Sequence, residues 1–163
     1  MTDPQRVALV TGSARRIGAT IARHLHAHGY RLALHAHHST EELQALAFDL
    51  ESERPGSVLA VQADLRDAQA LPELVDEVLA HFGRLDALVN NAGIAIVKPL
   101  LETSDEDWAR IMAVNLTGAF ICTTAAVPWR QQNGGGAIVN VTSISSLRAS
   151  TLRVAYGTSK AAL

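Results

Sequence analysis

Short apolar runs alternate with longer amphipathic segments along the chain, and this alternation is the strongest structural signal in the sequence. The runs at 7–10 and 31–36 have the length and composition typical of strands, and apolar residues recur at helical spacing over 17–25 between them. These segments predict a strand, a helix and a second strand in succession. The alternation continues with helices expected over 41–53 and 70–82, strands over 57–64 and 84–93, a long helix from about Ser104 through Cys122 toward Val127, a strand over 137–143, and a last helix that opens near Ala155.

Alternating strands and helices predict an α/β fold with a doubly wound, parallel sheet. The strand at 137–143 is apolar on both faces, so we expect it to be a central strand of that sheet. Ser104 precedes three acidic residues, and its hydroxyl is placed to cap the helix that follows. No linker or low-complexity tract divides the chain, so residues 1–163 are expected to form a single domain.

Composition and charge narrow the classes of function. The chain has 163 residues, of which 48% are hydrophobic, and a formal net charge of -2. This balance does not draw the molecule toward nucleic acid or an anionic membrane, so we expect no nucleic acid partner. No segment looks long enough to span a bilayer, so no membrane association is expected. Cys122 is the only cysteine, which excludes an intrachain disulfide and predicts a packed, inert thiol in a reducing, cytoplasmic setting.

The segment after the first strand has the composition of a phosphate-binding turn. Gly12 and Gly18 stand where this strand passes into a helix. Such a tight turn lets backbone N–H groups and the positive end of the helix face a pyrophosphate, and glycine permits the close approach. Its place in a strand–helix–strand unit favours dinucleotide binding over an ordinary turn. The candidate cofactor-binding residues in this segment are Gly12, Ser13, Arg15, Arg16, Ile17 and Gly18.

The end of the second strand indicates which dinucleotide is bound. It reads His35-Ala36-His37-His38-Ser39 and contains no carboxylate. A fold that selects NAD places Asp or Glu here, against the ribose 2'-hydroxyl, whereas cations and hydroxyl donors bind a 2'-phosphate. We therefore expect NADP(H), bound by His37, His38 and Ser39 and by an arginine of the turn. No metal is expected, because the histidines are divided between this strand and the first helix.

These motifs resemble those of the short-chain dehydrogenase/reductase family. The turn is similar to the family's TGxxxGxG, with Arg16 in the middle glycine position, as in the TGxxxRxG variant of pteridine reductases. The end of the second strand is similar to the HxHRS segment that pteridine reductases use around the 2'-phosphate, with His38 in place of the usual arginine. The resemblance covers essentially the whole chain and implies a Rossmann-like sheet with the strand order 3-2-1-4-5. It also implies that the family's last two strands are missing after Leu163, so we expect an incomplete domain.

The same resemblance assigns further cofactor-binding residues. Asp64 matches the position whose side chain meets the adenine amino group, with Leu65 assisting through its backbone. Asn90-Asn91-Ala92-Gly93 resembles the NNAG motif, in which the first asparagine stabilises the sheet. The rest of that motif, Asn91, Ala92 and Gly93, is expected to lie along the cofactor.

A candidate set of groups for proton transfer follows later in the chain. Tyr156 and Lys160 are four residues apart and so share one face of the last helix. Hydride transfer to a carbonyl leaves an oxygen that needs a proton, and a tyrosine can supply it if a cation stabilises its phenolate. Lys160 is expected to lower the tyrosine pKa in this way, and the resemblance places both side chains against the cofactor as well. Ser143 is expected to polarise the carbonyl.

Asn115 stands within an apolar helix, where a buried amide must find hydrogen-bond partners. In the family, an asparagine at this place distorts the helix and holds a water linked to the active-site lysine, so Asn115 is expected to support a proton relay. In the family this helix and the one with Tyr156 build an oligomer interface. A homo-oligomer, either a dimer or a tetramer, is therefore expected.

Three functions remain open. The later motifs resemble carbonyl reductases and 3-oxoacyl-carrier-protein reductases, which favours an NADPH-dependent reductase of a small ketone or aldehyde. The N-terminal third resembles pteridine reductases, which usually carry an aspartate where Ser143 stands, so a pterin substrate is the alternative. A non-catalytic NADPH-binding protein or degenerate paralogue is a second alternative, and the intact set of Ser143, Tyr156 and Lys160 argues against it.

Overall fold

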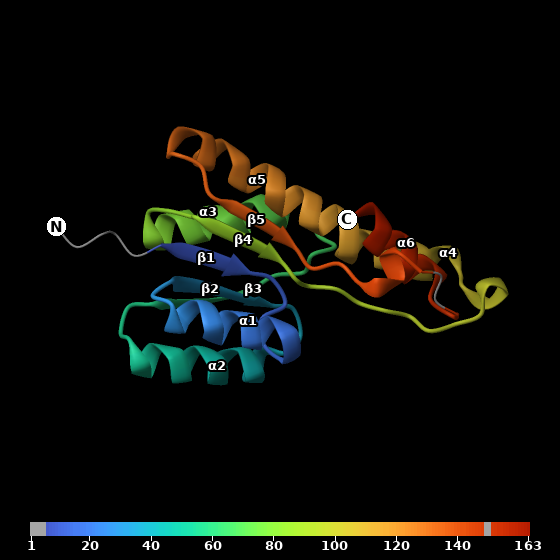
Figure 1. Cartoon of the computed structure of the whole chain (residues 1–163), viewed down its shortest axis with the longest axis horizontal. Coiled ribbons are helices and arrows are strands. Elements are labelled where there is room, and N and C mark those ends of the chain that lie inside the picture. Colours follow the sequence, from blue (N-terminus) through green and yellow to red (C-terminus); the bar gives the residue numbers. More distant parts are fainter. Residues whose placement is uncertain (1–5, 149–150) are drawn as a thin grey trace.

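A computed structural model describes residues 6–148 and 151–163, and within them five parallel strands form one sheet (Figure 1). The strand order is β3-β2-β1-β4-β5, and every neighbouring pair is parallel. The expected α/β fold and strand order are confirmed. The strands are β1 (Val7–Val10), β2 (Arg31–Ala36), β3 (Val58–Gln62), β4 (Ala87–Asn90) and β5 (Ala137–Asn140).

Helices cover both faces of the sheet. α1 and α2 lie on one face, α3 and α5 lie on the other, and α4 and α6 lie beyond the carboxyl ends of the strands (Figure 1). The α-helices are α1 (Arg16–Ala27), α2 (Thr40–Glu53), α3 (Ala70–Phe82), α4 (Asp105–Met112), α5 (Gly118–Gln132) and α6 (Val154–Ala162). Shorter helical segments are η1 (Leu100–Glu102), η2 (Ala113–Thr117) and η3 (Ile144–Ser146).

The hydrophobic core has two halves, one on each side of the sheet. β1 is central, and its side chains contribute to both halves of the core, because successive residues of a strand point to opposite faces. Leu9 packs with Leu74 and Cys122, whereas Ala8 packs with Leu43 on the other side. Cys122 is fully buried, and this burial raises the pKa of its thiol to about 11. The expectation of a packed, inert thiol is thus confirmed.

β5 lies where the strand order 3-2-1-4-5 places it, although the apolar pattern of residues 137–143 is typical of a central strand. It forms the edge of the sheet next to β4, and among the described residues no strand pairs with its other side. Val139 is 50% exposed, although a central strand would bury it. Apolar residues on both faces of a strand indicate helices above and below it and carry no information about a lateral neighbour, so the pattern does not conflict with an edge position.

A continuous helical segment joins α4, η2 and α5. It begins with the expected cap: the Asp107 backbone N–H donates to Ser104 Oγ at 3.2 Å, and the Ser104 N–H donates to the Asp107 carboxylate at 3.3 Å. This reciprocal pair is a capping box, which satisfies backbone groups that a helix start otherwise leaves unpaired. The segment then runs to Gln132, five residues past the expected end near Val127.

By length and composition this segment, Asp105–Gln132, could cross a membrane, which corrects the expectation that no segment is long enough. The sequence analysis missed it because the acidic first turn and Pro128 interrupt the apolar run. A third of its most apolar window is buried inside the protein. Its α5 part packs along the sheet beside α3 (Figure 1), and core helices of soluble proteins pass the same test.

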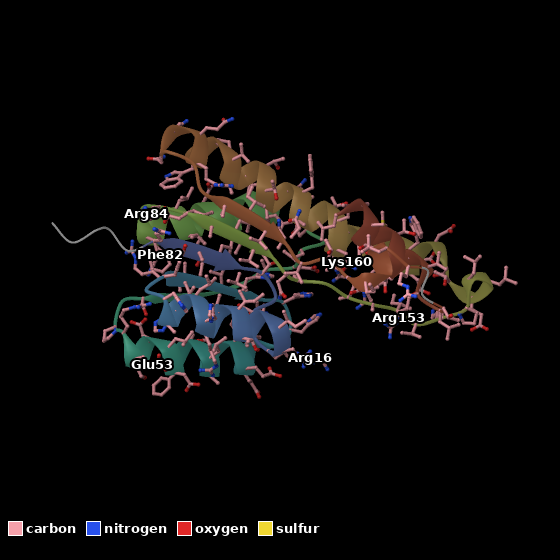
Figure 2. All side chains as sticks on the ribbon, in the orientation of Figure 1. Arg16, Glu53, Phe82, Arg84, Arg153 and Lys160 are labelled. Carbon is pink, nitrogen blue, oxygen red and sulfur yellow. The ribbon has the colours of Figure 1, made fainter. Side chains whose placement is uncertain are left out.

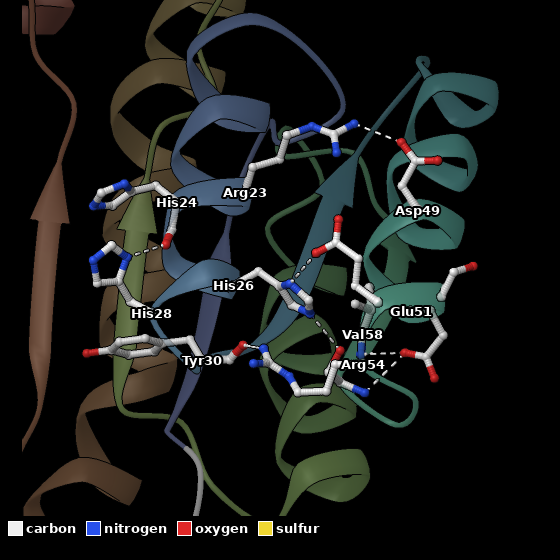
Figure 3. A network of polar contacts seen from close by, with 12 residues as sticks. Arg23, His24, His26, His28, Tyr30, Asp49, Glu51, Arg54 and Val58 are labelled. Carbon is white, nitrogen blue, oxygen red and sulfur yellow. Dashed lines mark hydrogen bonds and ion pairs between the residues drawn. The ribbon is translucent and has the colours of Figure 1, made fainter.

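Polar side chains join α1, α2 and β3 at the amino end of the sheet (Figure 3). His26 Nε2 lies 2.9 Å from Ser57 Oγ, and His26 Nδ1 lies 3.4 Å from the Glu53 carboxylate. The Glu51 carboxylate also accepts the backbone N–H of Val58 at 2.9 Å. A serine, a histidine and a carboxylate in this order occur in hydrolases, but Ser57 is only 1% exposed. The network therefore holds three elements together.

Candidate active site and cofactor cavity

A cavity of about 390 Å³ opens at the carboxyl ends of the parallel strands. Open α/β sheets bind ligands at this edge. Figure 2 shows Arg16 and Lys160 at this end of the molecule and Glu53 at the opposite end. The lining includes most of the residues expected to bind cofactor: Gly12, Arg15, Arg16, Ile17, Gly18, His37, His38, Ser39, Asp64, Leu65, Asn91, Ala92 and Gly93.

Close backbone contacts fix the turn after β1. Gly12 has φ +64°, and a Cβ at this position would lie 2.8 Å from the Cα of Ala92. A Cβ on Gly18 would lie 2.2 Å from the Gly12 carbonyl oxygen. Asn91 Nδ2 donates to the carbonyl oxygens of Thr11 and Gly12 at 2.9 and 3.0 Å. The turn and the segment after β4 are thus one packed unit in which only glycine fits at two positions.

The two arginines of the turn have different surroundings. Arg15 Nη1 lies 3.7 Å from the Glu42 carboxylate, and both side chains are largely exposed. Arg16 makes no ion pair within the described part of the chain, and it lines the cavity. Its φ is +53°, in the left-handed region that favours glycine. The backbone therefore agrees with the alignment of Arg16 to a glycine position, and its charge stays available at the cavity.

The end of β2 brings a cluster of polar rings to the cavity. The ring centroids of His37 and His38 are 3.6 Å apart, and Ser39 follows them at the start of α2. His37 Nε2 also lies 3.6 Å from the Asp64 carboxylate. His37, His38 and Ser39 carry no negative charge, so this side of the cavity suits an anionic group.

Asp64 does not face the cavity alone, since Arg66 binds its carboxylate. Arg66 Nε and Nη2 lie 3.0 and 2.6 Å from the two carboxylate oxygens. This pairing lowers the pKa of Asp64 to about 2. Arg66 lines the same cavity, and the sequence analysis did not identify it.

Asn115 connects two segments of the candidate catalytic site. It is completely buried in η2, a π-helical turn, which confirms that the long helix is distorted at this residue. Its amide accepts the Ile94 N–H at 2.8 Å and donates to the Ile94 carbonyl oxygen at 2.9 Å. It also donates to Ser159 Oγ at 3.0 Å, and Ser159 Oγ donates to the Tyr156 carbonyl oxygen at 2.8 Å. Ser159 was not identified from the sequence.

Lys160 points from α6 into the carboxyl end of the sheet. Its Nζ donates to the Val141 carbonyl oxygen at 2.7 Å, and the residue is only 4% exposed. Burial lowers the pKa of Lys160, because the charged form loses solvation. A Cβ on Gly93 would lie 3.5 Å from Lys160 Nζ and 3.4 Å from Asn115 Oδ1. Lys160, Asn115 and Gly93 therefore meet at one point.

Ser143 and Tyr156 lie on two segments that pack together. Ser143 follows β5 and is partly exposed, and its Oγ accepts the Ser145 N–H at 3.1 Å. A Cβ on Gly157 would lie 3.2 Å from the Ser145 carbonyl oxygen, so η3 presses against the first turn of α6. Tyr156, also partly exposed, stands in that turn. Both side chains are open to solvent at the same end of the sheet.

Three predicted cofactor-binding residues, Ser13, Tyr156 and Lys160, are not part of the cavity lining. Ser13 is fully buried, and its Oγ accepts the His35 N–H at 2.9 Å. Residues of the lining that the sequence analysis did not assign are Ala14, His35, Ala36, Arg66, Ile94, Arg110 and Val114. Arg110 and Val114 are four residues apart and so share one face of a helix, which was a usable but missed signal. Among the described residues, no three metal-binding side chains gather.

Comparison with known proteins gives consistent results at the level of family and structure. Residues 6–163 match the family described as short chain dehydrogenase. A D-threitol dehydrogenase of Mycolicibacterium smegmatis is 41% identical over 155 residues, which cover 95% of this chain and 59% of that protein. A 3-oxoacyl-acyl-carrier-protein reductase of Staphylococcus aureus is 36% identical over 137 residues, which cover 84% of this chain and 55% of that protein.

A solved structure shows the same likeness. The crystal structure is of a Sinorhizobium meliloti protein described as a short-chain alcohol dehydrogenase. Its TM-score to this chain is 0.91, with 36% sequence identity, and the match covers 96% of this chain and 62% of that one. The chain thus spans between 55% and 62% of the length of these three similar proteins.

Proposed function

This chain belongs to the short chain dehydrogenase family, and we propose that it carries the NADP(H) site and the proton-transfer groups of an oxidoreductase acting on a small carbonyl substrate. The observation that carries the proposal is the meeting of Gly93, Asn115 and Lys160 beside the cavity at the carboxyl ends of the strands. A dinucleotide cradle and a buried lysine are thereby joined in one site. The similar threitol dehydrogenase and oxoacyl reductase support an oxidoreductase.

The residues around the cavity fit a dinucleotide with a 2'-phosphate. Gly12 and Gly18 leave the space that a Cβ would occupy, so backbone N–H groups of the turn and the start of α1 can approach a pyrophosphate. Arg16 has no ion-pair partner in the described residues, and with His37, His38 and Ser39 it offers cations and donors for a phosphate. We propose that these residues select NADP(H) over NAD(H), within a single domain formed by the whole chain.

In the proposed mechanism the bound dinucleotide supplies the hydride, and the protein supplies the proton. Ser143 Oγ donates a hydrogen bond to the substrate oxygen and polarises the carbonyl. Tyr156 donates its phenolic proton to that oxygen as negative charge develops there. Lys160 stabilises the resulting phenolate, and its ammonium is held in place by the Val141 carbonyl oxygen. Asn115 keeps η2, the Ile94 segment and α6 in register around these groups and supports the proton relay.

The setting of this enzyme is part of the proposal. We propose that the protein works in the cytoplasm, where its buried Cys122 stays reduced, and that it forms a homo-oligomer. Phe120 on α5 is 64% exposed, and so large an apolar side chain on the outside of a helix suits contact with a second copy.

A pterin substrate is the second candidate, and it is favoured by Arg16 and the histidine segment at the NADP(H) end of the cavity. At the substrate end, Ser143 offers a hydroxyl where pteridine reductases usually carry a carboxylate. The two candidates can be separated by substrate, since a carbonyl reductase turns over ketones or aldehydes and leaves dihydropteridines unchanged. A protein that binds NADPH and reduces neither substrate is a non-catalytic member of the family.

The test is a titration with NADPH and NADH followed by nicotinamide fluorescence, combined with assays of carbonyl and dihydropteridine reduction on the protein as its gene encodes it. We expect tighter binding of NADPH than of NADH. Arg16→Ala should remove most of this preference, about tenfold for one lost charge-assisted contact. Tyr156→Phe should bind NADPH normally and lose turnover. If neither cofactor binds, the proposal is wrong.

A further inference from the structure

His35 is a buried histidine that belongs to none of the roles assigned so far. It lies near the carboxyl end of β2, is only 1% exposed, and borders the cavity beneath the turn that follows β1. The backbone N–H of Gly12 donates to its Nδ1 at 3.2 Å. Its Nε2 lies 3.0 Å from the carbonyl oxygen of Ala63, the residue before Asp64. The imidazole therefore bridges the turn and the end of β3.

The main chain of His35 holds the same turn. The Ser13 N–H donates to the His35 carbonyl oxygen at 2.9 Å, and the His35 N–H donates to Ser13 Oγ at 2.9 Å. Gly12 and Ser13 are thus bound by the ring and the backbone of one residue. Because Gly12 needs φ +64° and packs against Ala92, a small shift of the turn would disturb the whole cradle.

The two ring contacts require one protonation state. The Gly12 N–H is a donor, so Nδ1 must accept and cannot carry a proton. The Ala63 carbonyl oxygen is an acceptor, so Nε2 must carry one. Only the neutral Nε2–H tautomer satisfies both partners. A second proton would set an Nδ1–H against the Gly12 N–H, two donors at hydrogen-bond distance.

The surroundings also disfavour a charged ring. Burial lowers the pKa of His35, and the charge of His37 acts in the same direction. The hydrogen bond to the Ala63 carbonyl oxygen raises the pKa, and this influence is smaller than that of burial but larger than that of His37. The charged and titratable groups that share the cavity with His35 are Arg15 and Arg16 from the turn and α1, His37 and His38 after β2, Asp64 and Arg66 after β3, and Arg110 from α4.

We propose that His35 is a positioning residue whose neutral imidazole holds the phosphate-binding turn in its binding conformation, so that affinity for the dinucleotide falls when the ring is protonated. The ring does not need to touch the cofactor for this effect, since it acts through Gly12. This inference rests on the proposed dinucleotide function. It gives the protein a loss of cofactor affinity at low pH that is separate from proton transfer by Tyr156.

The sign of the pH effect follows from the direction of the shift. His35 is held neutral while its ring bonds the turn. It takes up a proton more readily when the turn is released. Cofactor binding therefore opposes protonation, and by linkage acidification weakens cofactor binding. Because the pKa of His35 is lowered while the ring holds the turn, the effect should begin at a pH below the ordinary histidine pKa of about 6.5 and should be absent above it.

The test compares dissociation constants of NADPH and NADH between about pH 7.5 and about pH 5.5 on the intact protein. We expect wild type to bind NADH more weakly at the lower pH, whereas the affinity for NADPH also responds to titration of its 2'-phosphate. NADH is needed because the 2'-phosphate of NADPH itself titrates near pH 6, whereas NADH has no such group. His35→Asn keeps an acceptor for the Gly12 N–H and should bind NADH with little pH dependence. His35→Leu should bind about tenfold more weakly even at the higher pH, because the Gly12 donor stays unpaired.

Two controls keep the result interpretable. His24→Asn removes an exposed histidine of α1 and should leave the pH profile as in wild type. Nitrogen NMR of the histidine rings should show His35 as the Nε2–H tautomer at the higher pH. A protonated Nδ1 there, or an unchanged pH profile in His35→Asn, overturns the inference while the proposed function stands. Failure of wild type to bind either cofactor at any pH overturns both.

Discussion

The backbone conformation of Arg16 favours glycine, whereas the proposed contact with a 2'-phosphate requires its charged side chain. Its φ of +53° lies where a side chain costs about 1–2 kcal/mol relative to glycine. Its neighbour Arg15 has an extended backbone with φ -154° and an ion pair to Glu42. Strain of this kind persists where function requires the side chain. A guanidinium facing the cavity at the start of α1 is such a requirement if a 2'-phosphate binds there.

We therefore predict opposite effects of Arg16→Gly on stability and on binding. The free energy of unfolding should rise by about 1 kcal/mol, because glycine adopts this φ without strain. NADPH affinity should fall as it does in Arg16→Ala. Urea unfolding measures the first effect, and nicotinamide fluorescence measures the second.

Arg15→Gly is the matched control for this prediction. Its φ is already ordinary for any residue, so glycine offers no relief and the protein should be no more stable than wild type. Equal stabilisation by both substitutions would mean that repulsion between the two arginines, and not backbone strain, is what glycine removes.

Among the structural elements, η2 connects the long helix to the segments at the carboxyl end of the sheet. A π-helical turn interrupts an otherwise regular helix, and such turns are frequent at functional sites. Here the interruption places the Asn115 amide against Ile94 on one side and Ser159 on the other. Three elements that are distant in sequence are thus held by one buried side chain.

We predict that Asn115→Ala lowers the free energy of unfolding by roughly 2 to 4 kcal/mol, since it leaves the partly buried N–H and carbonyl oxygen of Ile94 without their side-chain partner. Backbone amides of α6 should also exchange with solvent faster, because Ser159 loses its partner. Urea unfolding and hydrogen exchange provide the two measurements. Asn133→Ala, at the exposed end of α5, removes a comparable side-chain bond and should cost about 0.5 kcal/mol or less. A similar cost for both would rule out a bracing role for Asn115.

For the whole molecule, the question is what covers the outer face of the segment Asp105–Gln132. Trp108 and Phe120 are 41% and 64% exposed there, although the segment is apolar enough to cross a bilayer by composition. Contact with a second copy would remove this apolar surface from water. Phe48 on α2 is also exposed, at 74%, and lies on the opposite side of the sheet (Figure 1).

We predict that Phe120→Asp weakens self-association by at least about tenfold, as expected for a large anchoring side chain in an interface. Sedimentation measurements over a range of protein concentrations would show this as a shift toward the monomer. Phe48→Asp adds the same charge on the other side and should leave self-association unchanged. An unchanged assembly in Phe120→Asp, together with binding of wild type to lipid vesicles, would point instead to a membrane surface.

Local spacing in the sequence was enough to predict most elements, and the resemblance of the motifs to the family identified the residues of the candidate site. The strands at 7–10 and 31–36 and the helix at 70–82 have the bounds that the periodicity predicts. Strand periodicity also brought the motif residues to one edge, since Gly12, Asp64 and Ser143 all follow strands. These features depend on neighbouring residues, whose spacing decides which side chains share a face.

Contacts between distant segments were decided only by the tertiary structure. His35 meets Gly12 across 23 positions and Asn115 meets Ser159 across 44, and no local pattern marks either pair. Ser13 turns toward β2 instead of the cavity, and Arg66 folds back onto Asp64. Buried polar groups must find partners wherever packing places them, so the residues that brace this site become known only when the whole chain is folded.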